Sequence, residues 1–328
     1  MRNLSTLAWR AYDAPTKPWH GVVADTEGDD SVYVMRVERR DGVSQLTLAH
    51  ITPTGTEELA VLEVASAPPH VPDVADFRLL ADGGSSVNHM PAICVIGSGG
   101  DIVLMPVDEE ASAPAEVVGS VDQGILAAAW SPEEDVLVLI TGGEKRLIVM
   151  TREFEVMSET MLSTEAFGDD QPVNVGWGSK STQFHGSEGK QAAMAAANAP
   201  EESDPRGPLV PEDDGLPRIS WRGDGAFFVT SSAEASHDTV HRILRTYTRT
   251  GTLSATSDRS VRGISHVLAC RPTGNLIATT QRMGGPWAPG RHGRHDVVFF
   301  ERNGLRHGEF SLREEHGSVP DVPGVLAE

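Results

Sequence analysis

Four short segments of this chain share one layout, and their spacing constrains the fold more than any other feature. Each is a small apolar run that ends at Trp130, Trp177, Trp221 or Cys270, in steps of 47, 44 and 49 residues. After the first, third and fourth runs, a polar turn leads into a second apolar run. A period of about 40–50 residues with several strands in each unit is typical of a β-propeller. We therefore expect an all-β, WD40-like fold.

The composition fits such a fold. The chain has 328 residues, enough for one large domain or two ordinary ones, and 39% of them are hydrophobic. Aromatic residues make up only 5%, so the core must rest on Val, Leu, Ile and Ala. The 33 glycines and 21 prolines suit a chain with many turns.

The formal net charge of −20 disfavours direct binding of nucleic acid, because basic patches supply that affinity. The two cysteines, Cys94 and Cys270, both stand in apolar runs, which predicts buried reduced thiols. No segment resembles a signal peptide, and no apolar run approaches the roughly 18 residues that span a bilayer. We expect no membrane association.

Short runs rich in Val, Ile and Leu, bounded by Gly, Pro, Asp or Asn, predict the strands. Two clear hairpins are expected, at residues 93–105 around a Gly-rich turn and at 299–306 around Asn303-Gly304. Residues 189–216 are interpreted as an exposed, disordered insertion between blades. The predicted blades, about six of an expected seven, lie near residues 20–65, 77–120, 130–163, 177–221, 221–257 and 270–312.

Residues 167–190, a loop rich in glycine and polar side chains around Trp177, are too specific for a generic propeller. This stretch resembles the first WD40 propeller of the largest subunit of the Elongator complex, the IKAP family. Further segments agree with that family in the same order, strongly from about 120 to 313 and weakly from 5 to 118: residues 1–4, 130–133, 151–155, 221–225, 271–278 and 297–308.

The resemblance implies a non-enzymatic scaffold with no catalytic residue, cofactor or metal of its own. Members of the family hold the catalytic radical-SAM acetyltransferase-like subunit, together with a second propeller subunit. Their complex modifies wobble uridines of tRNA at carbon 5, so tRNA is expected to meet this chain only indirectly. Full-length members dimerise through a helical region that is absent here. We expect the protein in the cytoplasm, with a further pool in the nucleus.

The resemblance also implies that the chain, as the first N-terminal propeller over residues 1–328, is truncated at its C-terminal end. A further blade should follow Leu312, and residue 328 arrives too soon for it. An unpaired blade leaves open sheet edges, so closure of the propeller is in question.

The first candidate site is the loop from Gly176 to Gly189. Lys180, Gln183 and His185 are polar residues around Trp177 and Phe184, and aromatic residues among polar neighbours suit an interface. They suit an internal hydrogen-bonded corner between blades equally well, and both interpretations stay open.

The second candidate site is a Gly- and Pro-rich basic loop. Arg282, Arg291 and Arg294 stand there with Trp287. A basic loop with an aromatic side chain can stack a base, dock an acidic partner or be simply solvated, so three interpretations remain.

Patterns for chemistry are weak. Gly97-Ser98-Gly99-Gly100 lacks the Lys of a phosphate loop, and Ser187 lacks the glycine spacing of a nucleophile elbow. His292, His295 and His307 with Asp296 have no second ligand pair to complete a metal site. Two alternatives to the scaffold stay open: a generic propeller adaptor in another complex, and a propeller enzyme with a site in its central channel.

Overall fold

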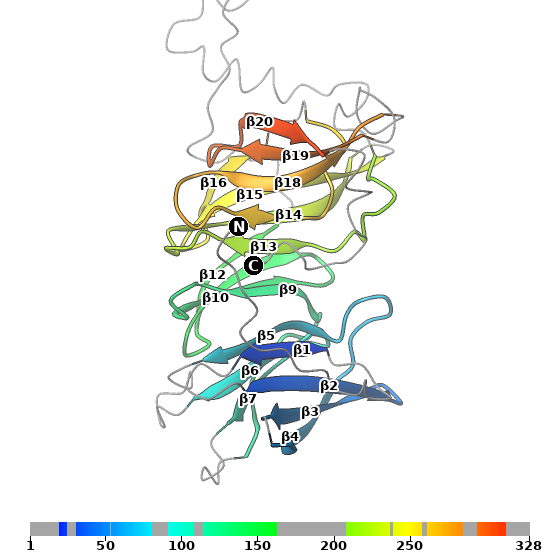
Figure 1. Ribbon diagram of the computed structural model, residues 1–328, viewed down its shortest axis with the longest axis vertical. Helices are drawn as coiled ribbons and strands as arrows, with labels where there is room; N and C mark the ends of the chain where they lie inside the picture. Colours follow the sequence, from blue (N-terminus) through cyan, green and yellow to red (C-terminus); the bar gives the residue numbers. More distant parts are fainter. Residues whose placement is uncertain are drawn as a thin grey trace, which may run out of the picture. The chain divides into compact units, whose positions relative to one another are not determined.

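The computed structural model describes residues 20–24, 31–52, 54–80, 91–107, 114–162, 208–236, 239–257, 261–284 and 294–312. These residues form strands and turns in five four-stranded antiparallel sheets, each made of four strands consecutive in the chain (Figure 1). The chain divides into two units, residues 1–120 and 121–328. Repeated sheets of this kind are the blades that the sequence period predicts.

The first unit holds two sheets, and in each the strand order follows the chain. The first sheet comprises β1 (Gly21–Ala24), β2 (Val32–Arg40), β3 (Val43–Ile51) and β4 (Thr56–Ala65). The second comprises β5 (Val74–Leu80), β6 (Ala92–Gly97), β7 (Asp101–Pro106) and β8 (Glu116–Ser120).

The second unit holds three sheets built in the same way. Sheet three comprises β9 (Ile125–Trp130), β10 (Val136–Thr141), β11 (Arg146–Thr151) and β12 (Val156–Met161). Sheet four comprises β13 (Arg218–Trp221), β14 (Phe227–Ser236), β15 (Thr239–Thr248) and β16 (Leu253–Thr256). Sheet five comprises β17 (Ala269–Cys270), β18 (Ile277–Arg282), β19 (His295–Phe300) and β20 (Arg306–Ser311).

Burial follows the position of a strand within its sheet. The second strands β6 and β10 are buried at every residue, as expected of short apolar runs covered on both faces. The fourth strands β12 and β20 are exposed at nearly every residue. The apolar cores therefore lie between neighbouring sheets and around their middle strands.

The predicted turns after Trp130, Trp221 and Cys270 are confirmed, because β9, β13 and β17 end at these residues. Side chains close the turns locally. The buried Ser131 hydroxyl accepts the backbone N–H of Val136 at 3.1 Å, and Asp224 accepts that of Ala226 at 3.1 Å. Such contacts to nearby backbone groups are the reason that Ser and Asp favour turns.

Both predicted hairpins are also confirmed. β6 pairs with β7, and β19 pairs with β20. In the first, a Cβ atom added at Gly99 would lie 2.0 Å from the backbone oxygen of Ala65, so this turn passes too close to the end of β4 for any side chain.

Most of the predicted blade at residues 177–221 lies outside the described residues. Trp177 and the residues up to 207 lie outside the described part of the chain, and β13 at the other end is the first strand of sheet four. The described residues form five sheets, and the sixth predicted unit stays a prediction.

The expected insertion at residues 189–216 is wrong at its C-terminal end. Residues 208–216 are described, Val210 is 2% exposed, and the side chain of Asp213 is fully buried. Pairing with arginines holds this acidic stretch on sheets four and five. The first part, 189–207, lies outside the described residues.

Candidate functional site

The first predicted contact loop lies outside the described residues. Trp177, Lys180, Gln183, Phe184 and His185 all belong to it, so their role as a contact surface stays a prediction.

Two residues of the predicted basic loop are described, and both are ion-paired within the chain. Arg294 donates from Nε and from a terminal nitrogen to the carboxylate of Asp296, at 2.7 Å each, and the Asp296 side chain is fully buried. The hydrogen bond to Asp296 raises the pKa of Arg294. Arg282, at the end of β18, pairs with Glu212. Trp287 and Arg291 lie outside the described residues.

The structure reveals an acidic run that sequence reasoning did not identify as structured. Glu212, Asp213 and Asp214 are consecutive and precede β13. Each pairs with a different arginine: Arg282 of β18, Arg242 of β15 and Arg218 of β13 respectively. We name these six residues the arginine clamp.

The central pair of the clamp is completely buried. Arg242 donates from Nε to Asp213 Oδ2 at 2.6 Å, and neither side chain is exposed. A terminal nitrogen of Arg242 also donates to the backbone oxygens of Leu216, at 3.1 Å, and Ser231, at 3.2 Å. A buried ion pair is tolerated when hydrogen bonds satisfy its remaining donors, as they do here.

The outer pairs of the clamp are partly exposed. The pKa of Asp214 is lowered: partial burial raises it, but the hydrogen bond and charge of Arg218 outweigh that effect. The pair between Glu212 and Arg282 reaches from the connection before sheet four to the second strand of sheet five. The clamp therefore fixes this connection to both sheets.

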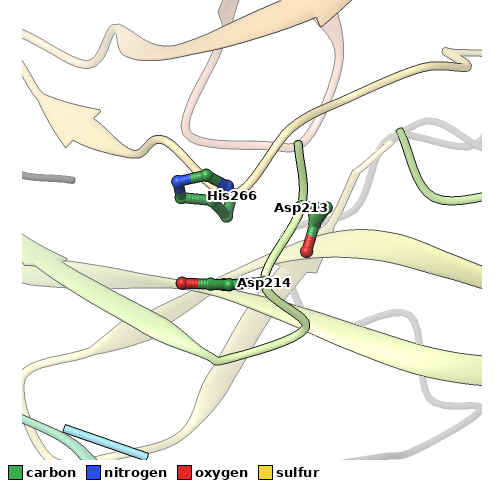
Figure 2. A group of neighbouring side chains, drawn as sticks. All are labelled: Asp213, Asp214 and His266. Carbon is green, nitrogen blue, oxygen red and sulfur yellow. The ribbon is translucent and has the colours of Figure 1, made fainter. Parts of the chain in front are cut away.

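One group of possible metal ligands occurs among the described residues. Ligand atoms of Asp213, Asp214 and His266 lie within 4.8 Å of one another, and Figure 2 shows the imidazole beside the turn that carries both aspartates. Burial lowers the pKa of His266, an effect partly offset by the charge of Asp214, and its Nδ1 is buried without a hydrogen-bond partner.

The chemistry of this group does not suit a cation. Both carboxylates already face guanidinium groups, those of Arg242 and Arg218. A divalent ion would have to displace two positive charges, one of them fully buried. Nor does the group suit a substrate, because the Asp213 carboxylate is inaccessible. We therefore interpret the three residues as part of the clamp.

The earlier histidine pattern gives no ligand set among the residues that the structure describes. His307 Nδ1 lies 2.5 Å from the carboxylate of Glu301, and Asp296 is engaged by Arg294. His292 lies outside those residues. No helix within the described residues is long and apolar enough to cross a membrane.

Comparison with known proteins gives the family. A family model described as the ELP1 first N-terminal beta-propeller matches residues 1–321. Elongator complex protein 1 of Mus musculus is 34% identical over 323 residues, which is 95% of this chain and 21% of that protein. The chain belongs to the Elongator complex protein 1 family.

Other members of the family match as well. The chain is 40% identical to Elongator complex protein 1 of Oryctolagus cuniculus over 221 residues, covering 67% of this chain and 15% of that protein. It is 38% identical to that of Schizosaccharomyces pombe over 224 residues, covering 68% and 17%. The chain thus spans about a fifth or less of the length of these relatives.

Two solved structures align with the chain at TM-scores below 0.5. The Chaetomium thermophilum Sqt1, solved bound to the N-terminus of ribosomal protein L10, aligns with a TM-score of 0.47 and 16% identity over 93% of this chain and 64% of that chain. The C-terminal WD40 domain of Sif2 aligns with a TM-score of 0.45 and 14% identity, over 85% and 57%. The fold rests on the family match and on the five four-stranded sheets, which together give an all-β β-propeller domain.

Proposed function

We propose that this chain is a non-catalytic scaffold segment of the Elongator complex. The observation that carries the proposal is the family match over residues 1–321. The structure supports it, because the one described group of clustered ligands, Asp213, Asp214 and His266, lies within an intramolecular clamp. Propellers present surfaces through loops and sheet edges, and this chain would act in the same way.

In this role the chain would help to hold the catalytic radical-SAM acetyltransferase-like subunit beside the second propeller subunit. The complex would then modify wobble uridines of tRNA at carbon 5, with tRNA bound elsewhere in the assembly. The net charge of −20 supports this division of labour, because an acidic chain repels the phosphate backbone. The proposal places the protein in the cytoplasm with a nuclear pool.

Tagging the endogenous protein and identifying its partners by mass spectrometry tests the proposal. We expect the catalytic subunit and the second propeller protein to copurify, and we expect a deletion strain to lose carbon-5 modified wobble uridine. Partners from an unrelated complex, with the modified nucleoside unchanged, would favour the generic adaptor instead.

The same preparation tests the predicted contact loop. Trp177→Ala with Phe184→Ala should reduce recovery of the other subunits at least about fivefold, since aromatic anchors carry much of an interface's binding energy. The matched control is Phe310→Ala, an exposed aromatic side chain on β20. Equal recovery from the double variant and the control would show that the loop is an internal corner.

A further inference from the structure

The fourth strands of the five sheets differ in how much apolar surface they expose. Three large side chains of β12, those of Val156, Met157 and Met161, are 58, 46 and 47% exposed. Among the described residues, β4, β8 and β20 each expose one such side chain, and β16 exposes none. β12 also contains one charged residue, Glu159, and no proline. It therefore lacks the proline and most of the charge that keep edge strands from pairing with other chains.

The outer edge of β12 has backbone groups that point away from sheet three. β12 is a terminal strand of this sheet, and β11 is its neighbour within the described residues. Leu162 donates its backbone N–H to the oxygen of Lys145 at 2.9 Å, and Met161 lies opposite Arg146. Opposite residues of an antiparallel pair alternate between hydrogen-bonded and non-hydrogen-bonded positions. The backbone groups of Met161 and Glu159 therefore point outward. We name residues 157–161 the β12 edge.

β4 in sheet one shows how the protein satisfies an edge group of this kind. Ser66 donates its backbone N–H to Gly42 at 3.4 Å, so the same alternation makes the N–H of Ala65 point outward. A side chain, that of Asp101, accepts this N–H at 2.8 Å. At Glu159 and Met161, no described side chain accepts the backbone N–H. These donors suit a further strand.

Glu159 places a carboxylate at the centre of the β12 edge. Its side chain is 43% exposed and pairs with Arg146 at 2.7 Å. Arg146 also pairs with Glu144 at 2.8 Å, so one guanidinium faces two carboxylates. An arriving cation can therefore bind Glu159 while Arg146 keeps Glu144 as a partner. The edge thus combines exposed apolar side chains with a central negative charge.

We propose that the β12 edge docks an extended basic segment of a partner protein as an additional β-strand. Main-chain hydrogen bonds to an exposed edge give affinity, and alternate side chains give specificity. Met157, Glu159 and Met161 follow one another in steps of two. The fitting segment therefore has a central Lys or Arg and an apolar residue two positions to either side, a pattern that is the same in both chain directions. Methionine suits such a surface because its flexible side chain adapts to different apolar partners.

A second copy of this chain fits the edge less well. Antiparallel pairing of two β12 strands about a two-fold axis would place Glu159 opposite Glu159 of the other copy. Like charges directly opposite each other destabilise a pair of strands. A basic segment is instead attracted, both by this carboxylate and by a chain of net charge −20. The proposal does not depend on which complex the protein joins, so its test is separate from that of the proposed function.

The test measures binding of a fluorescein-labelled nine-residue peptide to the complete chain by anisotropy. The peptide has lysine at its centre, valine two positions to either side and threonine elsewhere. We expect saturable binding. A second peptide, methylated on the backbone nitrogens of its five central residues, should bind at least about tenfold more weakly, because it cannot donate main-chain hydrogen bonds to an edge strand.

Met161→Pro tests the edge itself. Proline is tolerated where the N–H points away from the neighbouring strand, so the ladder with β11 should remain. The variant loses an outward donor and should bind the lysine peptide at least about fivefold more weakly. Val61→Pro in β4 is the matched control, because Val61 is 51% exposed and its N–H also points outward. The control should bind as the unchanged protein does.

Glu159→Lys tests the charge, and it keeps the proposal testable if the proline variant fails to fold. This variant should weaken binding of the lysine peptide about fivefold. It should strengthen binding of a peptide with glutamate at the centre by about the same factor, since the new pair again has opposite charges. A merely structural role of Glu159 would not produce this exchange of preference.

Four results would overturn the proposal. The first is the absence of saturable binding to the lysine peptide, and the second is equal binding of the methylated peptide. The third is an equal loss of affinity in Val61→Pro and Met161→Pro. The fourth is a dimer in sedimentation that Met161→Pro separates into monomers, which would show that the edge pairs two copies of the chain.

Discussion

The junction between sheets one and two and the junction between sheets three and four are built from different chemistry. The first is a cluster made almost entirely of aliphatic side chains and methionine, centred on residues such as Leu48 and Val95. The second contains an aromatic stack in which Phe228 lies 4.9 Å from Trp221 and 5.3 Å from Tyr247, measured between ring centroids.

Polar contacts cross both junctions: at the first, Arg39 pairs with Asp73 and the backbone N–H of Ala65 donates to Asp101 Oδ2 at 2.8 Å. Across the second junction, Trp221 Nε1 donates to the backbone oxygen of Ala129 at 3.2 Å, and Arg249 pairs with Asp135. Ala129, Asp135 and Trp221 stand in or beside the turns that follow the first strands, and Arg249 stands in the turn after β15. Directional contacts demand particular residues at particular positions, whereas aliphatic residues replace one another with little loss.

The aromatic stack gives the largest expected effect. Phe228→Ala should cost about 4 kcal/mol of unfolding free energy, because it removes a fully buried ring and leaves a cavity between two others. Leu48→Ala, equally buried at the first junction, should cost about 3 kcal/mol. Urea denaturation of both variants checks the order, and a larger loss at Leu48 would contradict the contrast drawn here.

Arg242→Met tests the arginine clamp and should cost about 3 kcal/mol, because it leaves the Asp213 carboxylate buried and unpaired. Adding Asp213→Leu should restore part of the loss, since the uncompensated charge disappears. The matched control is Arg249→Met in the same sheet, whose partly exposed pair with Asp135 should contribute less than about 1 kcal/mol. Equal losses from Arg242→Met and Arg249→Met would refute the structural role of the buried pair.

Asp76 in β5 is a carboxyl group in the largely aliphatic first unit, and it should make the stability of the protein depend on pH. Burial raises the pKa of Asp76 to about 6 from an ordinary value of 3.8. The native state therefore holds the proton more tightly than the unfolded state. Its contribution to stability is present below the unfolded pKa and is lost as pH rises towards the native pKa.

Asp76→Asn should accordingly stabilise the protein by about 2 kcal/mol at pH 7 and have almost no effect near pH 4. Urea midpoints of the variant and the unchanged protein at both pH values provide the measurement. A gain of the same size at pH 4 would show that the carboxyl titrates normally.

The smallest effect is expected at the second junction. Trp221→Phe keeps an aromatic ring beside Phe228 but removes the hydrogen bond to Ala129, and should cost about 1 kcal/mol. Thermal unfolding measures the change. A loss of stability as large as that of Phe228→Ala would mean that the Trp221 indole stabilises the protein mainly through packing and not through its hydrogen bond.

The sequence alone predicted those structural features that are stabilised by contacts between residues close together in the chain. The turns after Trp130, Trp221 and Cys270 could be predicted because their stabilising bonds join residues at most a few positions apart. The clamp could not, because the arginines that hold Asp213 and Glu212 lie 29 and 70 residues away. A consecutive acidic run near proline and glycine looks solvated until such distant partners are known.

The candidate sites show the same limit. From the sequence, Arg282 and Arg294 were candidate partner-binding cations. In the structure, both form ion pairs with carboxylates of the same chain. In contrast, Arg271 was noted only as part of the turn after Cys270, yet its side chain is exposed. Whether an arginine is available depends on its three-dimensional neighbours, which residue counts along a loop do not give.

Each sheet is made of four strands that follow one another without a crossover. No hydrogen-bond ladder therefore depends on a strand from elsewhere in the described chain, and a cut between two sheets breaks none of them. Such an arrangement lets evolution or an engineer duplicate, delete or exchange a whole sheet as a cassette. We expect a sheet with aliphatic faces to pack against other aliphatic sheets after such an exchange. Sheet four, which carries the aromatic stack, should need sheet three as its neighbour.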